Sequence, residues 1–388
     1  MKLHRRNGLV PQLLSLVLPG LLLGLFLFAT GCVISPRRLP GDVVPTGSGG
    51  STPTPTPTPA PTPTPTPTPA PTPTPTPLGK LYVVSETANA ILRFDNAFTA
   101  TGNVAPAATI TGAATQLNIP QYLALDTALD RLFVANLGGS SILVFDQIST
   151  KTGNVAPSRI IFGPTTGLIQ PSDVSYDKTR NALYVADGPD VYVFNSASNA
   201  NGDMAPARDI KPGFAVSALF IDSANDRLYL ADPSANAIAI FDSASVLNGA
   251  ATATRTLAGP TTNLFEPFGI QVDSAGRLIV SNSGTGSNGA ITVYSGAATV
   301  NGDVPPIVTT TGAATTLTAP TQIAINPSSS SGELYVANPF AGNIPIFTGY
   351  ASANGNVTPA RNINGAATTL VPSGGHPTAR GLALDDKR

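Results

Sequence analysis

The most constraining feature of the chain is a five-residue phrase close to Leu-Tyr-Val-Ala-Asn, which occurs six times at intervals of about fifty residues. Self-similarity at this period means that one supersecondary unit is repeated, and it limits the architecture before other residues are considered. The copies begin at Leu81, Leu132, Leu183, Leu228, Leu278 and Leu334. The sequence therefore predicts a repeat protein with six units.

Each unit divides into four short apolar runs, which in the second unit are 123–126, 132–136, 142–146 and 159–162. Short runs rich in Val, Ile, Phe and Tyr and bounded by Gly, Asn, Asp or Pro are typical of strands, whereas a helix needs about ten or more residues with a 3.6 period. Four antiparallel strands per unit, stacked radially, predict an all-β, six-bladed β-propeller. An open β-solenoid is the alternative, and it would need capping repeats that are not visible.

The turns repeat together with the strands. An Asp or Asn ends the first strand of five units, at Asp126, Asp177, Asp222, Asp273 and Asn326. Such side chains accept hydrogen bonds from the backbone that follows and stabilise a tight turn. We expect each of them to cap a hairpin.

The two ends of the repeat region complement each other. The first unit lacks its first strand, and the last residues, Leu382-Ala383-Leu384-Asp385, match Leu123-Ala124-Leu125-Asp126. Joining the tail 386–388 to Gly79 and Lys80 leaves five residues before Leu81, the interval that separates Asp126 from Leu132. We therefore expect the C-terminal strand to become the innermost strand of the first blade and to close the ring.

The first residues have the pattern of a secretory signal, with a basic start, an apolar stretch over 13–28 and small residues before Cys32. The stretch could also pass for a short membrane span. The ending Ala29-Thr30-Gly31-Cys32 resembles the lipobox of bacterial lipoproteins. That resemblance implies that residues 1–31 are removed and that Cys32 is acylated, and Val33 after it implies the outer membrane. The alternative is an ordinary secretory signal with an accidental Cys.

A low-complexity segment separates this signal from the repeats. Residues 32–78 contain a Gly/Ser joint and then a Thr-Pro alternation over 52–77. Pro at every second position blocks helix and sheet and favours polyproline II, which at about 3.1 Å per residue would reach roughly 80 Å. We interpret 32–78 as a disordered linker and 79–388 as the propeller.

Composition excludes several functions. Charged residues make up 11% of the chain and the net charge is −1, so the basic stripe of a nucleic-acid-binding protein is missing. The single Cys excludes a disulfide framework. His376 is the one His after the signal, which argues against His-rich zinc sites, and there is no Gly-x-Ser-x-Gly motif. We predict no catalytic residue.

Candidate ligand contacts lie on the loops near the start of the innermost strands. They form a predicted ligand rim of Gln121, Asp173, Glu266, Phe268, Gln322 and Arg380. Carboxylate and amide oxygens suit a hard cation, so Glu266 is the candidate ligand for calcium, although it can equally be a solvated loop carboxylate. The Asp or Asn that ends most second strands recurs from unit to unit, so it is predicted to cap a turn rather than to form one site.

The motifs Pro-x-x-Leu-Ala-Leu-Asp, Leu-Tyr-Val-Ala-Asn and Ile-x-Val-Phe-Asp resemble NHL-type and YVTN-type propeller repeats over residues 79–388. The resemblance implies a binding scaffold. Six-bladed relatives such as gluconolactonases and other lactonases are metal-dependent hydrolases with a Glu, Asn and Asp set in the channel, and that set is not assigned to residues of this chain.

These observations predict a lipid-anchored protein of the bacterial cell envelope, in the outer membrane or at the cell surface, with a monomeric propeller. Its expected role is non-catalytic binding of an envelope polymer, small molecule or protein, with no cofactor and no nucleic acid. The first alternative is a calcium-dependent lactonase that uses Glu266 at the channel. The second is a structural surface-coat protein.

Overall fold

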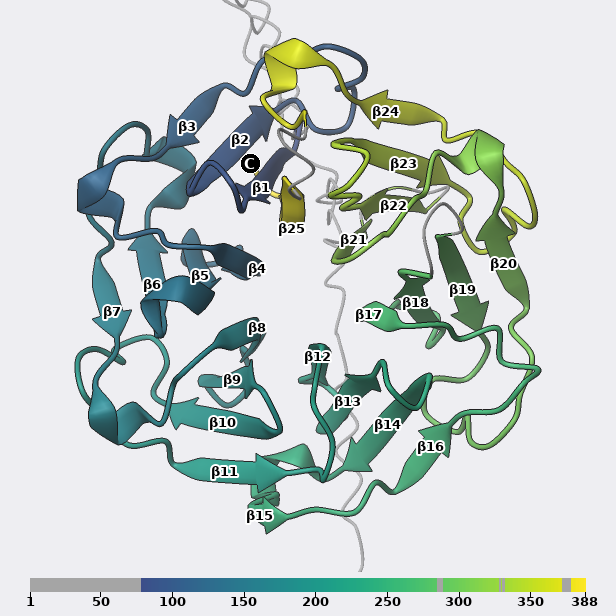
Figure 1. Cartoon of the computed structure of the whole chain (residues 1–388), viewed down its shortest axis with the longest axis horizontal. Coiled ribbons are helices and arrows are strands. Elements are labelled where there is room, and N and C mark those ends of the chain that lie inside the picture. The colour runs from purple at the N-terminus through teal and green to yellow at the C-terminus, as the bar shows by residue number, and fades with distance from the viewer. Residues whose placement is uncertain (1–77, 285–288, 328, 330–331, 372–377) are drawn as a thin grey trace, which may run out of the picture. The chain divides into compact units, whose positions relative to one another are not determined.

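The computed structural model describes residues 78–284, 289–327, 329, 332–371 and 378–388. In this part of the chain six sheets surround a central axis, which confirms the predicted six-bladed propeller (Figure 1). The predicted signal peptide, Cys32 and the Thr-Pro segment lie outside the described residues. None of the helices in the described ranges is long and apolar enough to cross a membrane.

Four antiparallel strands form each blade, and their order below runs from the channel outward. Blade 1 comprises β25 (Ala379–Asp385), β1 (Lys80–Ser85), β2 (Ala90–Asp95) and β3 (Ala108–Ile110). Blade 2 comprises β4 (Pro120–Asp126), β5 (Arg131–Asn136), β6 (Ser141–Asp146) and β7 (Arg159–Ile161). Blade 3 comprises β8 (Pro171–Asp177), β9 (Ala182–Asp187), β10 (Asp190–Asn195) and β11 (Arg208–Lys211), to which β15 (Gly249–Ala250) is added in parallel.

The remaining blades follow the same plan. Blade 4 comprises β12 (Ala218–Asp222), β13 (Arg227–Asp232), β14 (Ala237–Asp242) and β16 (Arg255–Leu257). Blade 5 comprises β17 (Pro267–Val272), β18 (Leu278–Asn282), β19 (Ala290–Tyr294) and β20 (Val308–Thr311). Blade 6 comprises β21 (Ile323–Asn326), β22 (Glu333–Val336), β23 (Ile344–Thr348) and β24 (Arg361–Ile363).

Helical structure in the described residues is limited to single 3₁₀ turns in the loops. They are η1 (Ala113–Thr115), η2 (Leu137–Gly139), η3 (Ile148–Thr150), η4 (Pro164–Thr166), η5 (Ala244–Val246), η6 (Ala313–Thr315) and η7 (Ala366–Thr368).

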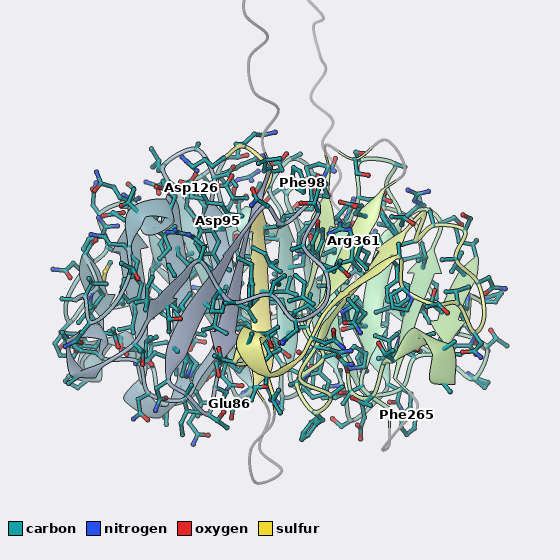
Figure 2. All side chains as sticks on the ribbon, turned by 90° about the horizontal axis from the view of Figure 1, so that it is seen from above. Glu86, Asp95, Phe98, Asp126, Phe265 and Arg361 are labelled. Carbon is teal, nitrogen blue, oxygen red and sulfur yellow. The ribbon has the colours of Figure 1, made fainter. Side chains whose placement is uncertain are left out.

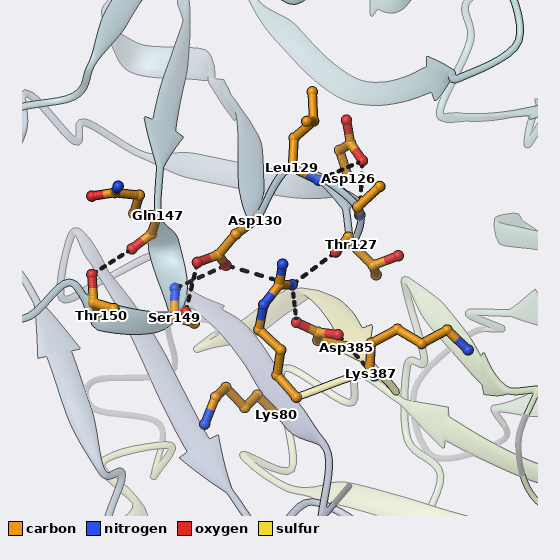
Figure 3. A network of polar contacts seen from close by, with 12 residues as sticks. Lys80, Asp126, Thr127, Leu129, Asp130, Gln147, Ser149, Thr150, Asp385 and Lys387 are labelled. Atoms are coloured by element: carbon orange, nitrogen blue, oxygen red, sulfur yellow. Dashed lines mark hydrogen bonds and ion pairs between the residues drawn. The ribbon is translucent and has the colours of Figure 1, made fainter.

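The predicted closure by the C-terminal strand is confirmed. β25 pairs antiparallel with β1, and Lys80 lies opposite Asp385. The last residue then fastens blade 1 to blade 2, because Arg388 Nη1 donates to the Thr127 carbonyl and to Asp385 Oδ2, both at 2.8 Å (Figure 3). Asp130 lies 3.8 Å from the same guanidinium.

The Asp residues at the strand ends cap hairpins as predicted. Asp126 Oδ1 accepts from the amides of Ala128 at 3.0 Å and Leu129 at 3.2 Å. Asp177 and Asp385 make the same contact with the amides two residues on. Each side chain thus satisfies backbone donors that the turn would otherwise leave unpaired.

The hydrophobic core lies between neighbouring blades. Leu81 and Phe94 of blade 1 belong to one cluster with Tyr335 and Ile346 of blade 6, and the other clusters join neighbouring blades in the same way. The Tyr335 hydroxyl also donates to the Ala97 carbonyl of blade 1 at 3.1 Å. Each blade is therefore stabilised by the next one rather than by a core of its own.

A second set of contacts joins the blades at the outer rim, and the sequence reasoning missed it. The link between β6 and β7 reaches back to blade 1, where the Gly153 amide donates to the Thr109 carbonyl at 2.7 Å. The Thr111 amide donates in turn to the Gly153 carbonyl at 3.2 Å. Parallel bridges of this kind recur at Gly102, Gly202, Gly302 and Gly355.

Candidate binding face and central channel

The repeated blade path gives the propeller two distinct faces. The innermost strands begin at one face and end at the other, so the loops between blades and the hairpins between second and third strands share the first face. Figure 2 shows Glu86 and Phe265 near that face and Asp95 and Asp126 near the opposite one. The two faces differ in chemistry.

Exposed apolar side chains gather on the face where the innermost strands begin, which we call the apolar face. Among the described residues ten large apolar side chains are exposed, and six of these lie on loops of this face. Ile169 is 71% exposed and Phe265 44% exposed. The six are Ile119, Phe162, Ile169, Phe265, Phe340 and Val371.

Ion pairs gather on the opposite side, which we call the charged face. Asp242 lies between two guanidiniums, with Arg227 Nε at 2.6 Å and Arg255 Nη1 at 2.7 Å. Hydrogen bonding to Arg255, together with Arg227, holds the pKa of Asp242 well below its usual range. Arg361 makes a comparable pair with Glu333 at 2.6 Å.

The central channel contains a cavity of about 270 Å³ lined by the innermost strands of all six blades. Three residues of the predicted ligand rim, Asp173, Phe268 and Gln322, line this cavity. The structure therefore brings half of the predicted rim together inside the channel.

Gln322 crosses the channel and connects three blades. From blade 6, its Oε1 accepts from the amides of Leu382 in blade 1 at 2.9 Å and Leu123 in blade 2 at 3.1 Å. Its Nε2 donates to the Leu123 carbonyl at 2.8 Å. Gly381 makes room for this bridge, because a Cβ there would lie 3.0 Å from Gln322 Oε1 and 2.4 Å from the Gln121 carbonyl oxygen. Gln322 thus provides hydrogen-bond partners for backbone groups at the inner edges of β4 and β25, where no neighbouring strand follows.

Asp173 bridges blades 3 and 4 in a similar way. Its carboxylate accepts from the Val174 amide at 2.7 Å and the Leu219 amide at 2.8 Å. The side chain is buried, and this burial raises the pKa of Asp173 to about 8, although the two amide donors act in the opposite direction. Asp173 is the buried carboxyl of the channel that can change its charge near neutral pH.

Gln121 and Arg380 contact each other where β4 and β25 begin. Arg380 Nε donates to Gln121 Oε1 at 2.9 Å. Arg380 also lies 3.7 Å from Glu86, whose Oε2 is buried without a hydrogen-bond partner. The sequence analysis did not identify Glu86 as a candidate. The only sequence signal that could have identified it is that an acidic residue directly follows the second strand of the first unit.

Glu266 lies outside the set of residues that line the channel cavity. Its amide donates to Asn236 Oδ1 at 2.8 Å, and its φ is 49°. Ile119 takes the same place in blade 2, with φ 49° and its amide 2.7 Å from Asn89 Oδ1. This turn accepts either side chain. Across the described ranges, no group of three or more His, Cys, Asp or Glu side chains is arranged to hold a metal ion.

The Asp and Asn residues that end the second strands hold the loops of the apolar face, as predicted. Asn136 Oδ1 accepts from the Asn118 amide at 2.7 Å. Asp187 accepts from the amides of Ile169 at 2.6 Å and Gln170 at 3.0 Å. These contacts fix the loops that carry the exposed apolar side chains.

Comparison with known proteins shows similarity of fold. No family model matches the chain, and no curated protein matches its sequence. A chain of the nidogen/laminin complex aligns with TM-score 0.50 and 11% identity, over 79% of this chain and 98% of that one.

Two further solved structures are similar at lower scores. The WD40 β-propeller domain of Doa1 aligns with TM-score 0.48 and 11% identity, over 74% of this chain and 79% of that domain. Hydrazine synthase of Kuenenia stuttgartiensis aligns with TM-score 0.43 and 16% identity, over 61% of this chain. This chain spans 65% of the length of that synthase chain. At these identities the likeness concerns the fold alone.

Proposed function

We propose that this chain is an envelope lipoprotein whose propeller binds a protein partner, without catalysis, through the apolar face. The observation that carries the proposal is that six of the ten exposed large apolar side chains of the described residues lie on this face, among them all three exposed Phe residues, Phe162, Phe265 and Phe340. Interface cores are depleted in charge and enriched in aromatic residues.

The spacing of these side chains favours a large partner. Ile119, Ile169 and Phe265 belong to loops between three different pairs of blades, so one small molecule would not reach them all. The amides of these loops donate hydrogen bonds to residues such as Asn136 and Asp187, which hold the loops in place. A face that is already ordered loses less conformational entropy on binding.

The position of the first strand is compatible with binding through the apolar face. β1 begins at the charged face, because Lys80 pairs with Asp95 and Asp385. A stalk of residues 32–78 would therefore join the propeller at the charged face, and the apolar face would not carry the attachment point. The resemblance to NHL-type and YVTN-type repeats also favours a binding scaffold.

The test is photo-crosslinking in cells that make the full chain. A photoreactive amino acid replaces Phe265 on the apolar face or, as a control, Leu129, which is 53% exposed on the charged face. We expect a discrete protein adduct from position 265 and none from 129. Equal adducts at both positions, or none at either, would reject the proposal.

The same cells distinguish the alternatives. Crosslinks between copies of this chain would favour a surface-coat protein over a monomeric binder. Calcium retained by the purified protein and lost in Glu266→Gln would favour the hydrolase. Release from the membrane fraction in Cys32→Ser tests the lipid anchor, and retention there would contradict it.

A further inference from the structure

Five Asn-Gly pairs lie in the part of the chain that the structure describes, and the fold holds one of them differently from the rest. The pair Asn364-Gly365 follows β24 and leads into the 3₁₀ turn η7. All five Asn residues are exposed, so access of water does not distinguish them. The other four pairs belong to the outer bridges between blades and are Asn201-Gly202, Asn248-Gly249, Asn301-Gly302 and Asn354-Gly355.

Asn-Gly is the dipeptide in which an asparagine side chain loses its amide group most readily. The glycine nitrogen, once deprotonated, attacks the asparagine Cγ. The new N–C bond closes a five-membered succinimide, and ammonia leaves. Water then opens the succinimide on one side or the other, which yields aspartate or isoaspartate. Glycine favours this reaction because it has no Cβ that would hinder the attacking nitrogen. Hydrogen bonds that hold the glycine N–H or the asparagine side chain slow it.

The outer bridges hold both reacting groups of the pairs that they contain. Asn201 Oδ1 accepts from the Ile160 amide at 3.0 Å, and the Gly202 amide donates to the Ile160 carbonyl at 2.6 Å. The asparagine oxygens of the other three bridges accept from amides of the preceding blade at 2.9 or 3.0 Å. Their glycines are paired with that blade in the same way, and they are Gly249, Gly302 and Gly355.

Asn364 has neither of these restraints. Within the described ranges, no hydrogen bond holds its side chain or the Gly365 amide. Its own amide donates to the Gly102 carbonyl at 3.0 Å, which fixes the backbone before the pair but leaves the two reacting groups free. The turn does not require asparagine at this place, because its counterparts before the other turns are Thr111, Phe162, Ala258 and Thr311.

We propose that Asn364 is the site of spontaneous deamidation among these five pairs and that the fold protects the other four. An isoaspartate at this position adds a methylene group to the backbone next to the bridge in which the Gly102 amide donates to the Asn362 carbonyl at 2.6 Å. That bridge joins blade 6 to blade 1 at the outer rim, where the ring closes. The modification therefore loosens the closing junction at its outer edge, while β25 stays paired with β1 at the channel.

The test is ageing of the purified, folded full chain in mildly alkaline buffer, followed by peptide mapping with mass spectrometry that separates the Asn, Asp and isoaspartate forms. We expect Asn364 to convert about tenfold faster or more than the four bridge asparagines, because those pairs must first break the hydrogen bonds of the bridge. The same chain unfolded in guanidinium chloride is the control, and there the five pairs should react at similar rates. Equal rates in the folded chain, or a slower rate at Asn364, would overturn the proposal. The pair at Asn288, which lies outside the described residues, is left out of this comparison.

Substitutions test the position itself. Ala258→Asn places an Asn-Gly pair before the turn between blades 4 and 5, where the Ala258 amide donates to the Gly302 carbonyl at 3.1 Å, and it should create a second fast site. A slow reaction there would contradict the role of the position.

The effect on the closing junction is read from the melting temperature before and after ageing. The aged chain should melt at a lower temperature than the fresh one. Asn364→Thr, which has the residue found at Thr111 and Thr311, should abolish this fall, whereas Asn354→Thr in an outer bridge is the matched control and should leave it unchanged. An unchanged melting temperature after complete conversion at Asn364, or an equal fall in Asn364→Thr, would show that the modification does not loosen the junction.

Discussion

The two faces of the propeller use their side chains in opposite ways. On the charged face, basic groups bind partners in the same and the neighbouring blade, as Arg361 does with Glu333 and with the carbonyls of Ala97 and Ala100. On the apolar face, side chains such as Ile169 and Phe265 project into solvent. If the apolar face binds a partner as proposed, stability and recognition depend on separate surfaces, and substitutions should affect one without the other.

The largest effect is expected from deletion of residues 379–388. This removes β25 and the contacts of Arg388 on the charged face, and it leaves β1 without its inner partner. An uncovered strand edge favours aggregation. Size-exclusion chromatography and thermal melts should show aggregation or loss of a cooperative transition, whereas a soluble, cooperatively folding truncation would contradict the importance of closure. Arg388→Ala, which keeps the strand, should cost only about 1 kcal/mol.

Arg361→Ala should be the most damaging single substitution of this set. It removes the Glu333 pair and two inter-blade hydrogen bonds, and it leaves a largely buried carboxylate without its partner. We expect a loss of about 2–4 kcal/mol in the free energy of unfolding, measured with urea. Lys211→Ala is the matched control, since that exposed lysine also has two acidic partners. A similar loss in both variants would contradict the distinction between the faces.

The pH dependence of stability should contain a contribution from Asp173. Its pKa is raised to about 8 in the folded protein, above the unfolded value near 3.9. Between these values the folded state holds a proton that the unfolded state has released, so the contribution to stability falls as pH rises. The slope approaches about 1.4 kcal/mol per pH unit at its steepest.

Denaturation midpoints from pH 5 to 8 test this expectation, because carboxylates with lowered pKa values, such as Asp242, lose their stabilisation only at more acidic pH. Asp173→Asn should remove the slope. The slope is the readout rather than the absolute stability, since an amide cannot accept from both the Val174 and Leu219 amides as the carboxylate does. Parallel curves for the two proteins would show that Asp173 does not titrate in this range.

The smallest effect on stability is expected from Ile169→Ser and Phe265→Ser. These side chains are exposed, and such surface substitutions change stability by about 0.5 kcal/mol or less. They should nevertheless weaken capture of the partner in a pull-down with the full chain. A marked drop in melting temperature would show that the apolar face supports the fold, and unchanged capture would weaken its assignment as the binding surface.

The sequence predicted the strands, the blade number and the closure, because these depend on alternating apolar residues and on turn residues at fixed offsets. It did not predict the contact between Gly153 and Thr109, because that bridge joins strand β3 to the irregular link between β6 and β7, and the link has no hydrophobic pattern. The predicted ligand rim was identified only from the positions of its residues near the start of the innermost strands. It grouped Asp173 and Gln322, which line the channel, with Glu266, which does not.

The placement of β1 bears on how the propeller withstands mechanical load. This strand lies between β2 and β25 and is paired along its length with both. A force applied to the chain before Leu78 would act along β1 and load both rows of hydrogen bonds in shear at once, instead of peeling them apart one by one. If residues 32–78 tether the propeller as proposed, this double pairing would resist force on the chain before Leu78, whereas β25, which has a partner strand on one side only, would yield at a lower force.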